Sequence, residues 1–131
     1  MSYVLDTNTL IYFFKGVGQV ASHLYSCAPN KIIIPTIVLY ELNVGIQKST
    51  SPDKRLSQLS TLLEQVRVMP FGRKEAEISA QIRAKLERRG KTIGPYDIQI
   101  AGCALANNAT LVTHNTREFE RVKDLQIVDW F

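Results

Sequence analysis

The chain has 131 residues, of which 45% are hydrophobic and 21% are charged, and its formal net charge is +4. This balance excludes a disordered chain, and the length suffices for one domain, residues 1–131, with a core that needs no metal or disulfide. No run approaches the ~20 apolar residues of a membrane span. There is no signal peptide either, so a cytoplasmic protein is expected.

The first half of the chain predicts alternating strands and helices. Apolar or β-branched runs indicate strands at residues 4–6 and 31–34. Apolar residues at helical spacing predict helices at residues 9–15, 20–27, 37–48 and 53–65, with a turn at Pro29-Asn30 between the second helix and the second strand.

The second half continues the alternation. Its predicted helices are residues 73–89, the longest, and residues 95–107, which Pro95 opens at the first helical position. Strands are expected at residues 66–69, 110–113 and 126–128, with a short helix or turn at 115–122. Strands that alternate with helices indicate an α/β fold whose parallel sheet is covered on both faces. Cys27 and Cys103 lie far apart and outside any CxxC pair, so both are expected to be small buried thiols.

Four carboxylates stand at unusual places. Asp6 ends the first strand, Glu41 lies within an apolar helix, Asp97 is the third residue of its helix, and Glu118 follows the fourth strand. Each has an ordinary explanation. Asp6 or its neighbour Asn8 could cap a helix, Glu41 could sit on a narrow wet face, and Asp97 could complement the helix dipole. Glu118 has the spacing of a capping box with residue 115.

Taken together, the four positions favour a shared site. Three follow strand-to-helix connections at the carboxyl edge of the sheet, where α/β folds bind ligands. Two carboxylates ~4 Å apart repel by roughly 4 kcal/mol at an effective dielectric of 20. This repulsion exceeds the stabilisation that a helix cap provides. Such a cluster needs cations, and its oxygen-only ligands favour Mg²⁺ or Mn²⁺. Metal ions of this kind serve nucleases.

The positive charges agree with a nucleic-acid partner. With these four acids set aside, eight remain against 16 Lys and Arg, an excess of eight positive charges. Arg83, Lys85, Arg88, Arg89 and Lys91 cluster before Asp97, and Arg117 and Arg121 flank Glu118. A basic rim around an acidic pit suits phosphodiester cleavage. The alternative for the five-residue cluster is a solvated helix face with cations at its C-terminus.

Several polar residues beside these acids are candidates for supporting roles. Thr7, Asn8, Thr113 and Asn115 could hold carboxylates or metal-bound water, and Arg117 could contact substrate. His23 and His114 carry no ligand spacing, and at most a substrate contact is expected of His114.

The chain resembles the PIN-domain ribonucleases, specifically the VapC toxins of bacterial toxin–antitoxin pairs. The resemblance runs in order along nearly the whole chain. It rests on Leu5-Asp6-Thr7-Asn8, on Tyr40-Glu41-Leu42 with Gly45, on Ile93-Gly94-Pro95-Tyr96-Asp97 with Ile100-Ala101, and on Val112-Thr113-His114-Asn115-Thr116-Arg117-Glu118-Phe119.

The resemblance implies a three-layer α/β/α sandwich with a five-stranded parallel sheet, and RNA cleavage that depends on Mg²⁺ or Mn²⁺. It implies Asp6 and Asp97 as the main metal ligands and Glu41 as the third acid of the catalytic set. Many family members have Asp-x-Asp-Phe in the fourth block, where this chain has Asn115, two residues, then Glu118-Phe119. Either Asn115 or Glu118 could therefore supply the fourth ligand.

The resemblance further implies a VapB-like antitoxin partner and a toxin homodimer. The block around Asn115 to Val122 looks most like the VapC group that cuts initiator tRNA in its anticodon region. The alternative is a non-catalytic RNA- or partner-binding PIN module, which the intact acids disfavour. A phosphatase or receiver domain of the same fold class is disfavoured as well, because Asn8 and Met69-Pro70 stand where those proteins need acids.

Overall fold

A five-stranded sheet, parallel throughout, forms the centre of the molecule, as predicted. The computed structural model describes all 131 residues. The strands run in the order β3-β2-β1-β4-β5, and each adjacent pair is parallel. Their bounds are β1 (Tyr3–Leu5), β2 (Ile32–Pro35), β3 (Arg67–Met69), β4 (Thr110–Val112) and β5 (Ile127–Val128).

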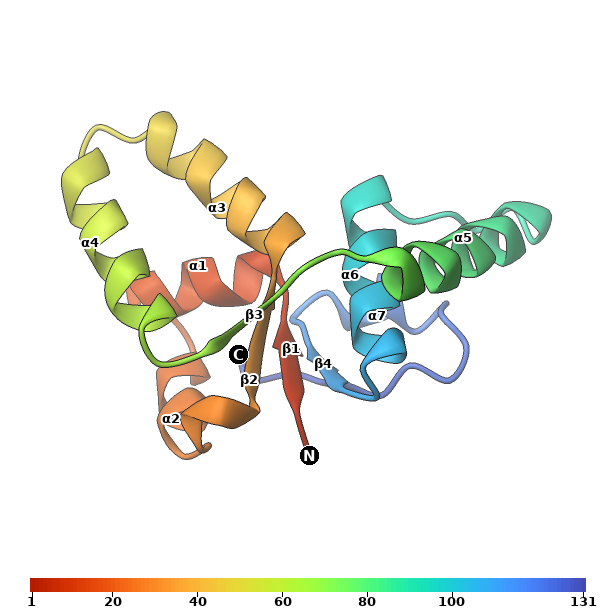
Figure 1. Cartoon of the computed structure of the whole chain (residues 1–131), viewed down its shortest axis with the longest axis horizontal. Coiled ribbons are helices and arrows are strands. Elements are labelled where there is room, and N and C mark those ends of the chain that lie inside the picture. Colours follow the sequence, from red (N-terminus) through yellow and green to blue (C-terminus); the bar gives the residue numbers. More distant parts are fainter.

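Seven α-helices cover the two faces of this sheet. In Figure 1 α1 to α4 gather on one side of the strands and α5 to α7 on the other, which gives the expected three layers. The helices are α1 (Thr7–Lys15), α2 (Val20–Tyr25), α3 (Thr36–Gln47), α4 (Pro52–Leu63), α5 (Arg73–Arg88), α6 (Pro95–Ala106) and α7 (Thr116–Phe119), with a 3₁₀ turn, η1 (Pro29–Lys31), before β2.

Some predicted boundaries were wrong by one or two residues. The first strand ends at Leu5, because Asp6 is already the N-cap of α1, so that helix begins at Thr7 and not at residue 9. Pro35 does not stop the second strand but belongs to it and pairs with Met69 of β3. The chain turns into α3 directly afterwards, where the missing N–H of a proline costs little. Gly16 ends α1 in the left-handed conformation, at φ 68°.

The core lies on both faces of the sheet and is apolar. Val4 and Leu5 of β1 and Leu111 and Val112 of β4 are fully buried. Cys103 is buried as predicted, whereas Cys27 is only half-buried, because it follows the end of the short helix α2 and lines a surface pocket. None of the helices has the length and apolar character that crossing a bilayer demands.

The connections reverse direction at the central strand. From β1 the chain proceeds outward through β2 to β3, then returns to the other side of β1 to form β4 and β5. The carboxyl ends of β1 and β4 therefore flank a switch point, where open α/β sheets form their ligand crevices. In Figure 1 α1 and α3 start near this edge, and the first turn of α6 lies toward it.

Candidate active site

Asp6 is anchored by both carboxylate oxygens at the switch point. Oδ1 accepts a hydrogen bond from the backbone N–H of Thr9 at 2.9 Å, so Asp6 caps α1. Oδ2 accepts a hydrogen bond from Oγ1 of Thr113 at 2.5 Å. The residue is 5% exposed, and burial raises its pKa against the opposing effect of these hydrogen bonds. The cap of α1 is therefore Asp6, while neighbouring Asn8 is exposed and does not cap.

The residues that follow β4 hold Asp6 in place. The backbone N–H of Asn115 donates to Oγ1 of Thr113 at 3.0 Å, and that hydroxyl in turn donates to Asp6. A fully buried threonine therefore joins the ends of β1 and β4. This geometry supports the prediction that Thr113 orients a carboxylate.

Glu41 is fixed by the first helix. Oγ1 of Thr7, the first residue of α1, donates to Oε1 of Glu41 at 2.7 Å. Glu41 lies on α3 and is half-buried, so its face of the helix is neither wet nor part of the core. Thr7 therefore holds a second carboxylate next to the Asp6 cap.

The raised pKa of Asp97 indicates that the four acids lie near one another. Gly94 is the N-cap of α6 and Pro95 its first residue, which puts Asp97 in the first turn as predicted. The pKa of Asp97 is raised to about 6, first by burial and then by the negative charges of Asp6, Glu118 and Glu41. The sheet edge therefore brings together all four carboxylates that the sequence singled out.

The capping box that was the ordinary alternative for Glu118 does not form. Asn115 is the N-cap of α7, but its side chain makes no capping hydrogen bond. Its Nδ2 instead donates to Oε2 of Glu118 at 3.0 Å. The side chains of Asn115 and Glu118 are thus hydrogen-bonded to each other.

The four acids fit a divalent cation by chemistry. Their donors are all oxygens, as Mg²⁺ and Mn²⁺ prefer. The raised pKa of Asp97 shows that the negative charge is not balanced by nearby Lys or Arg. In the structure no group of three or more Asp, Glu, His and Cys side chains is arranged to hold a metal ion. The carboxylates are therefore close enough to repel one another, but they do not converge on one point.

Three neighbours of the site went unnoticed in the sequence. The rings of Tyr40 and Tyr96, each next to one of the acids, are exposed and pack edge to face at 5.8 Å. Asp129 contributes to the raised pKa of Asp6 and lies 2.9 Å from Nδ1 of His114. The tyrosines could have been found from their adjacency to the acids. Asp129 could not, because 122 residues separate it from Asp6 and no motif contains it.

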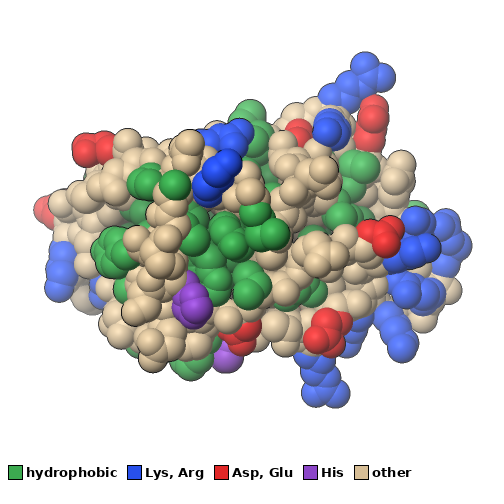
Figure 2. All heavy atoms as spheres, turned by 90° about the horizontal axis from the view of Figure 1, so that it is seen from below, with side chains coloured by type: hydrophobic (Ala, Val, Ile, Leu, Met, Phe, Trp, Pro, Cys, Tyr) green, Lys and Arg blue, Asp and Glu red, His purple; other side chains and the backbone are tan.

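The predicted basic rim is only partly free. Arg83 pairs with Glu87 at 2.9 Å, and Arg89 and Arg121 donate to the carbonyls of Arg121 and Thr92. These last two bonds tie the end of α5 and the loop before α6 to the segment after α7. Exposed side chains that remain available are Lys85, Arg88, Lys91 and Arg117. Figure 2 shows Lys and Arg side chains concentrated at the end of the molecule toward which α5 extends.

Comparison with known proteins agrees with this fold. Residues 3–125 match the PIN domain, and the chain belongs to the PIN-domain family. The tRNA(fMet)-specific endonuclease VapC of Salmonella typhimurium is 35% identical over 130 residues, which cover 99% of this chain and 98% of that protein. The ribonuclease VapC2 of Rickettsia felis is 37% identical over 132 residues, with the same coverage. Within the PIN-domain proteins, the chain therefore belongs to the VapC family.

A solved structure supports the same assignment. The crystal structure of VapBC2 from Rickettsia felis bound to a DNA fragment from their promoter matches this fold with a TM-score of 0.93. The match has 36% sequence identity and covers 100% of both chains. The likeness in fold therefore extends over the whole chain.

Proposed function

We propose that the protein is the toxin of a type II toxin–antitoxin pair, an endoribonuclease that hydrolyses phosphodiester bonds with Mg²⁺, or Mn²⁺ in its place. The observation that carries this proposal is the gathering of four carboxylates at one edge of the sheet, where burial and the charges of the other three acids raise the pKa of Asp97. A cluster of acids at the carboxyl edge of a parallel sheet suits a metal-assisted hydrolase. Its place in the VapC family identifies RNA as the polymer that is cut.

The residues of the cluster take different roles in this proposal. Asp6, Asp97 and Glu41 would hold the metal ion, which when bound supplies an activated water and neutralises charge on the phosphate. Thr113 and Thr7 hold Asp6 and Glu41 through the hydrogen bonds described above. Glu118 completes the catalytic acids.

Three further residues would act at the periphery of this site. Asn115 would orient Glu118 through their hydrogen bond. Asn8 and Arg117 are exposed at the rim of the site. Both would contact the substrate.

The substrate and partners follow from the relatives. A relative in Salmonella typhimurium is specific for tRNA(fMet), and initiator tRNA is the substrate proposed here. Relatives of known structure occur as VapBC assemblies on DNA. A VapB-like antitoxin that covers the acids and a toxin homodimer are therefore proposed as well. Cleavage of initiator tRNA in its anticodon region would stop translation until the antitoxin binds.

One observation favours a second candidate function, a non-catalytic RNA- or partner-binding module. No three of the acids are arranged so that they could hold one metal ion. A module of this kind would bind RNA tightly without metal-dependent turnover.

Metal-dependent cleavage by acid variants separates the two candidates. Purified protein without antitoxin is incubated with an initiator tRNA transcript, with and without Mg²⁺, and the products are resolved by gel. The wild type should cut only with Mg²⁺. Asp6→Asn and Asp97→Asn should each lose more than ~100-fold in rate, since even second-shell residues of metal sites cost 10–100-fold. Asp53→Asn, which changes an exposed acid on α4, is the matched control. Equal cutting by all four proteins would show that the metal assignment is wrong.

A further inference from the structure

A small pocket opens beside the acids, between α1, α3 and α4. We call it the side pocket. Its volume is about 270 Å³, and Glu41 forms part of its wall. Gly45 lies four residues after Glu41 on α3, so both occupy the same face of that helix. The side pocket therefore borders α3 from Glu41 to Gly45.

The side pocket combines an apolar floor with positive charge. Leu42, Ile46 and Leu59 form part of the floor, and Phe14 adds an aromatic wall. A side chain at Gly45 would meet no atom within 4 Å, so the absence of one keeps this space open.

Two cations line the pocket. They are Lys15, the last residue of α1, and Arg55 of α4. Neither takes part in any of the three ion pairs of the structure. The one side-chain hydrogen bond of Arg55 is to Oε1 of Gln58, at 3.2 Å. Both cations are thus available to an anionic ligand.

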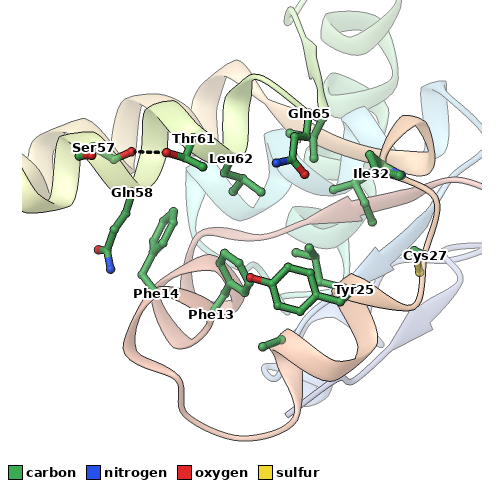
Figure 3. A pocket seen from close by; sticks show the side chains of 14 residues that line it. Phe13, Phe14, Tyr25, Cys27, Ile32, Ser57, Gln58, Thr61, Leu62 and Gln65 are labelled. Carbon is green, nitrogen blue, oxygen red and sulfur yellow. Dashed lines mark hydrogen bonds between the residues drawn. The ribbon is translucent and has the colours of Figure 1, made fainter.

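The larger pocket of the molecule differs in kind. It has a volume of about 620 Å³ and lies between α1, α2 and α4, where Figure 3 shows Phe13, Phe14 and Tyr25 lining it opposite Leu62. No Lys, Arg, Asp or Glu lines it. The larger pocket therefore lacks a cation that could pair with a phosphate. The side pocket, which shares Glu41 with the catalytic acids, is the one that suits a nucleotide.

We propose that the side pocket binds one unpaired nucleotide of the RNA next to the cleaved bond. The base would lie against Phe14 and the open face of α3 at Gly45, and its phosphate would contact Lys15 and Arg55. Proteins recognise single-stranded RNA by stacking splayed bases on aromatic side chains and by phosphate contacts to cations. The volume lies just below the ~300–1,000 Å³ of pockets for drug-sized ligands, which suits a single base.

The inference rests on the proposed function, because it takes RNA as the substrate. Its test is a pair of variants with a matched control for each. Gly45→Leu fills the side pocket, and Val44→Leu enlarges an exposed neighbour on α3 that does not line it. Arg55→Gln removes one lining cation, and Lys54→Gln removes the exposed charge next to it.

The readouts are kcat and KM for Mg²⁺-dependent cleavage of the initiator tRNA transcript. Gly45→Leu and Arg55→Gln should each raise KM about tenfold with kcat changed by less than threefold, and both controls should match the wild type. Melting temperatures check that each variant folds, and Gly45→Leu should melt no lower than the wild type. If the wild type cuts and all variants share its KM, the inference is wrong while the proposed function stands.

A second measurement does not depend on cleavage. A short RNA with 5-iodouracil is irradiated with the Asp6→Asn protein, and cross-linked peptides are identified by mass spectrometry. Cross-links at Phe14 or its neighbours support the proposal, and their absence from α1 and α3 overturns it. The proposal is also overturned if Gly45→Leu leaves KM unchanged but weakens antitoxin binding or changes the oligomer mass. The side pocket would then belong to a protein interface.

Discussion

The raised pKa of Asp97 has a consequence for the stability of the folded chain. Its pKa rises from 3.8 to about 6 because it is partly buried and faces Asp6, Glu118 and Glu41. An acid with a raised folded pKa binds its proton more tightly in the folded chain. Its favourable contribution to folding is therefore complete below about pH 3.8 and is lost as the pH rises through about 6. At neutral pH the cluster costs stability unless a cation balances it.

Asp97→Asn removes this cost and should stabilise the metal-free protein at pH 7.5. The expected gain is about 1 kcal/mol, because a full two-unit shift must be discounted for a side chain that is only half-buried. The gain should shrink toward zero at pH 4, where the wild-type carboxyl is protonated. Urea unfolding of both proteins without metal, at pH 4 and 7.5, measures the difference, and Asp53→Asn serves as control. A gain that is equal at the two pH values would contradict the electrostatic origin.

Added metal should act in the opposite way on the same two proteins. A ligand that binds only the folded chain stabilises it by ~2.7 kcal/mol at 100 times its dissociation constant. Millimolar Mn²⁺ should therefore raise the melting temperature of the wild type and leave Asp97→Asn almost unchanged, while Ca²⁺ provides a comparison of ion size. Equal shifts in both proteins would mean that the metal binds elsewhere. This measurement needs no RNA and so tests the metal site apart from catalysis.

At the scale of secondary structure, most elements could be predicted from the local sequence. Gly16 and Pro95 stand at helix ends, and their backbone preferences alone mark those ends. The errors lie where long-range contacts decide. Pro35 continues β2 because β3 pairs with it, and Cys27 is half-exposed because α2 ends early. Neither feature can be predicted from the neighbouring residues in the sequence.

The candidate site shows the same division. The four acids could be chosen from their places after strands and in helices. The bonds from Thr113 to Asp6 and from Thr7 to Glu41 span 107 and 34 residues, so the sequence could nominate these threonines but not pair them. Asn115 makes a hydrogen bond to Glu118 and does not cap α7. This choice depends on side-chain geometry, which the spacing in the sequence does not determine.

The packing of α5 on α6 depends on the absence of a side chain at Gly102. A Cβ there would lie 1.8 Å from Oγ and 2.9 Å from Cβ of Ser79, which is buried and whose hydroxyl has no hydrogen-bond partner. Gly102→Ala should therefore destabilise the protein by about 1–3 kcal/mol, as overpacked cores do. Gly45→Ala, in open space on α3, should instead stabilise by ~0.5–1 kcal/mol. Urea unfolding of both compares the same change in two environments.

A double variant separates the clash from other effects. Ser79→Gly in the Gly102→Ala background removes both close atoms of the serine side chain, and it should recover part of the loss despite the ~1 kcal/mol that glycine costs in a helix. Additive losses in the double variant would show that Ser79 is not what Gly102 accommodates.

At the scale of the whole molecule, the exposed Lys and Arg side chains at the end of α5 lie apart from the four acids. The four acids stand at the carboxyl edge of the sheet, and the free cations concentrate toward the end of α5. The bonds from Arg89 and Arg121 attach that end to the segment after α7 and to Thr92, in the loop that leads to α6 and Asp97. We expect an RNA backbone that binds these cations to follow this loop toward the acids. The net charge of +4 adds a general attraction that salt screens.

Arg88→Gln with Lys91→Gln tests whether the end of α5 holds the RNA backbone. The affinity of the Asp6→Asn protein for a short single-stranded RNA is measured against salt concentration. Each lost phosphate contact lowers the slope of log affinity against log salt by ~0.7, so the double variant should flatten it by about 1.4. Lys31→Gln with Arg67→Gln removes the same charge from exposed positions at the amino ends of β2 and β3, away from the acids. If both pairs flatten the slope equally, the positive charge acts as a diffuse field and the end of α5 is no specific RNA track.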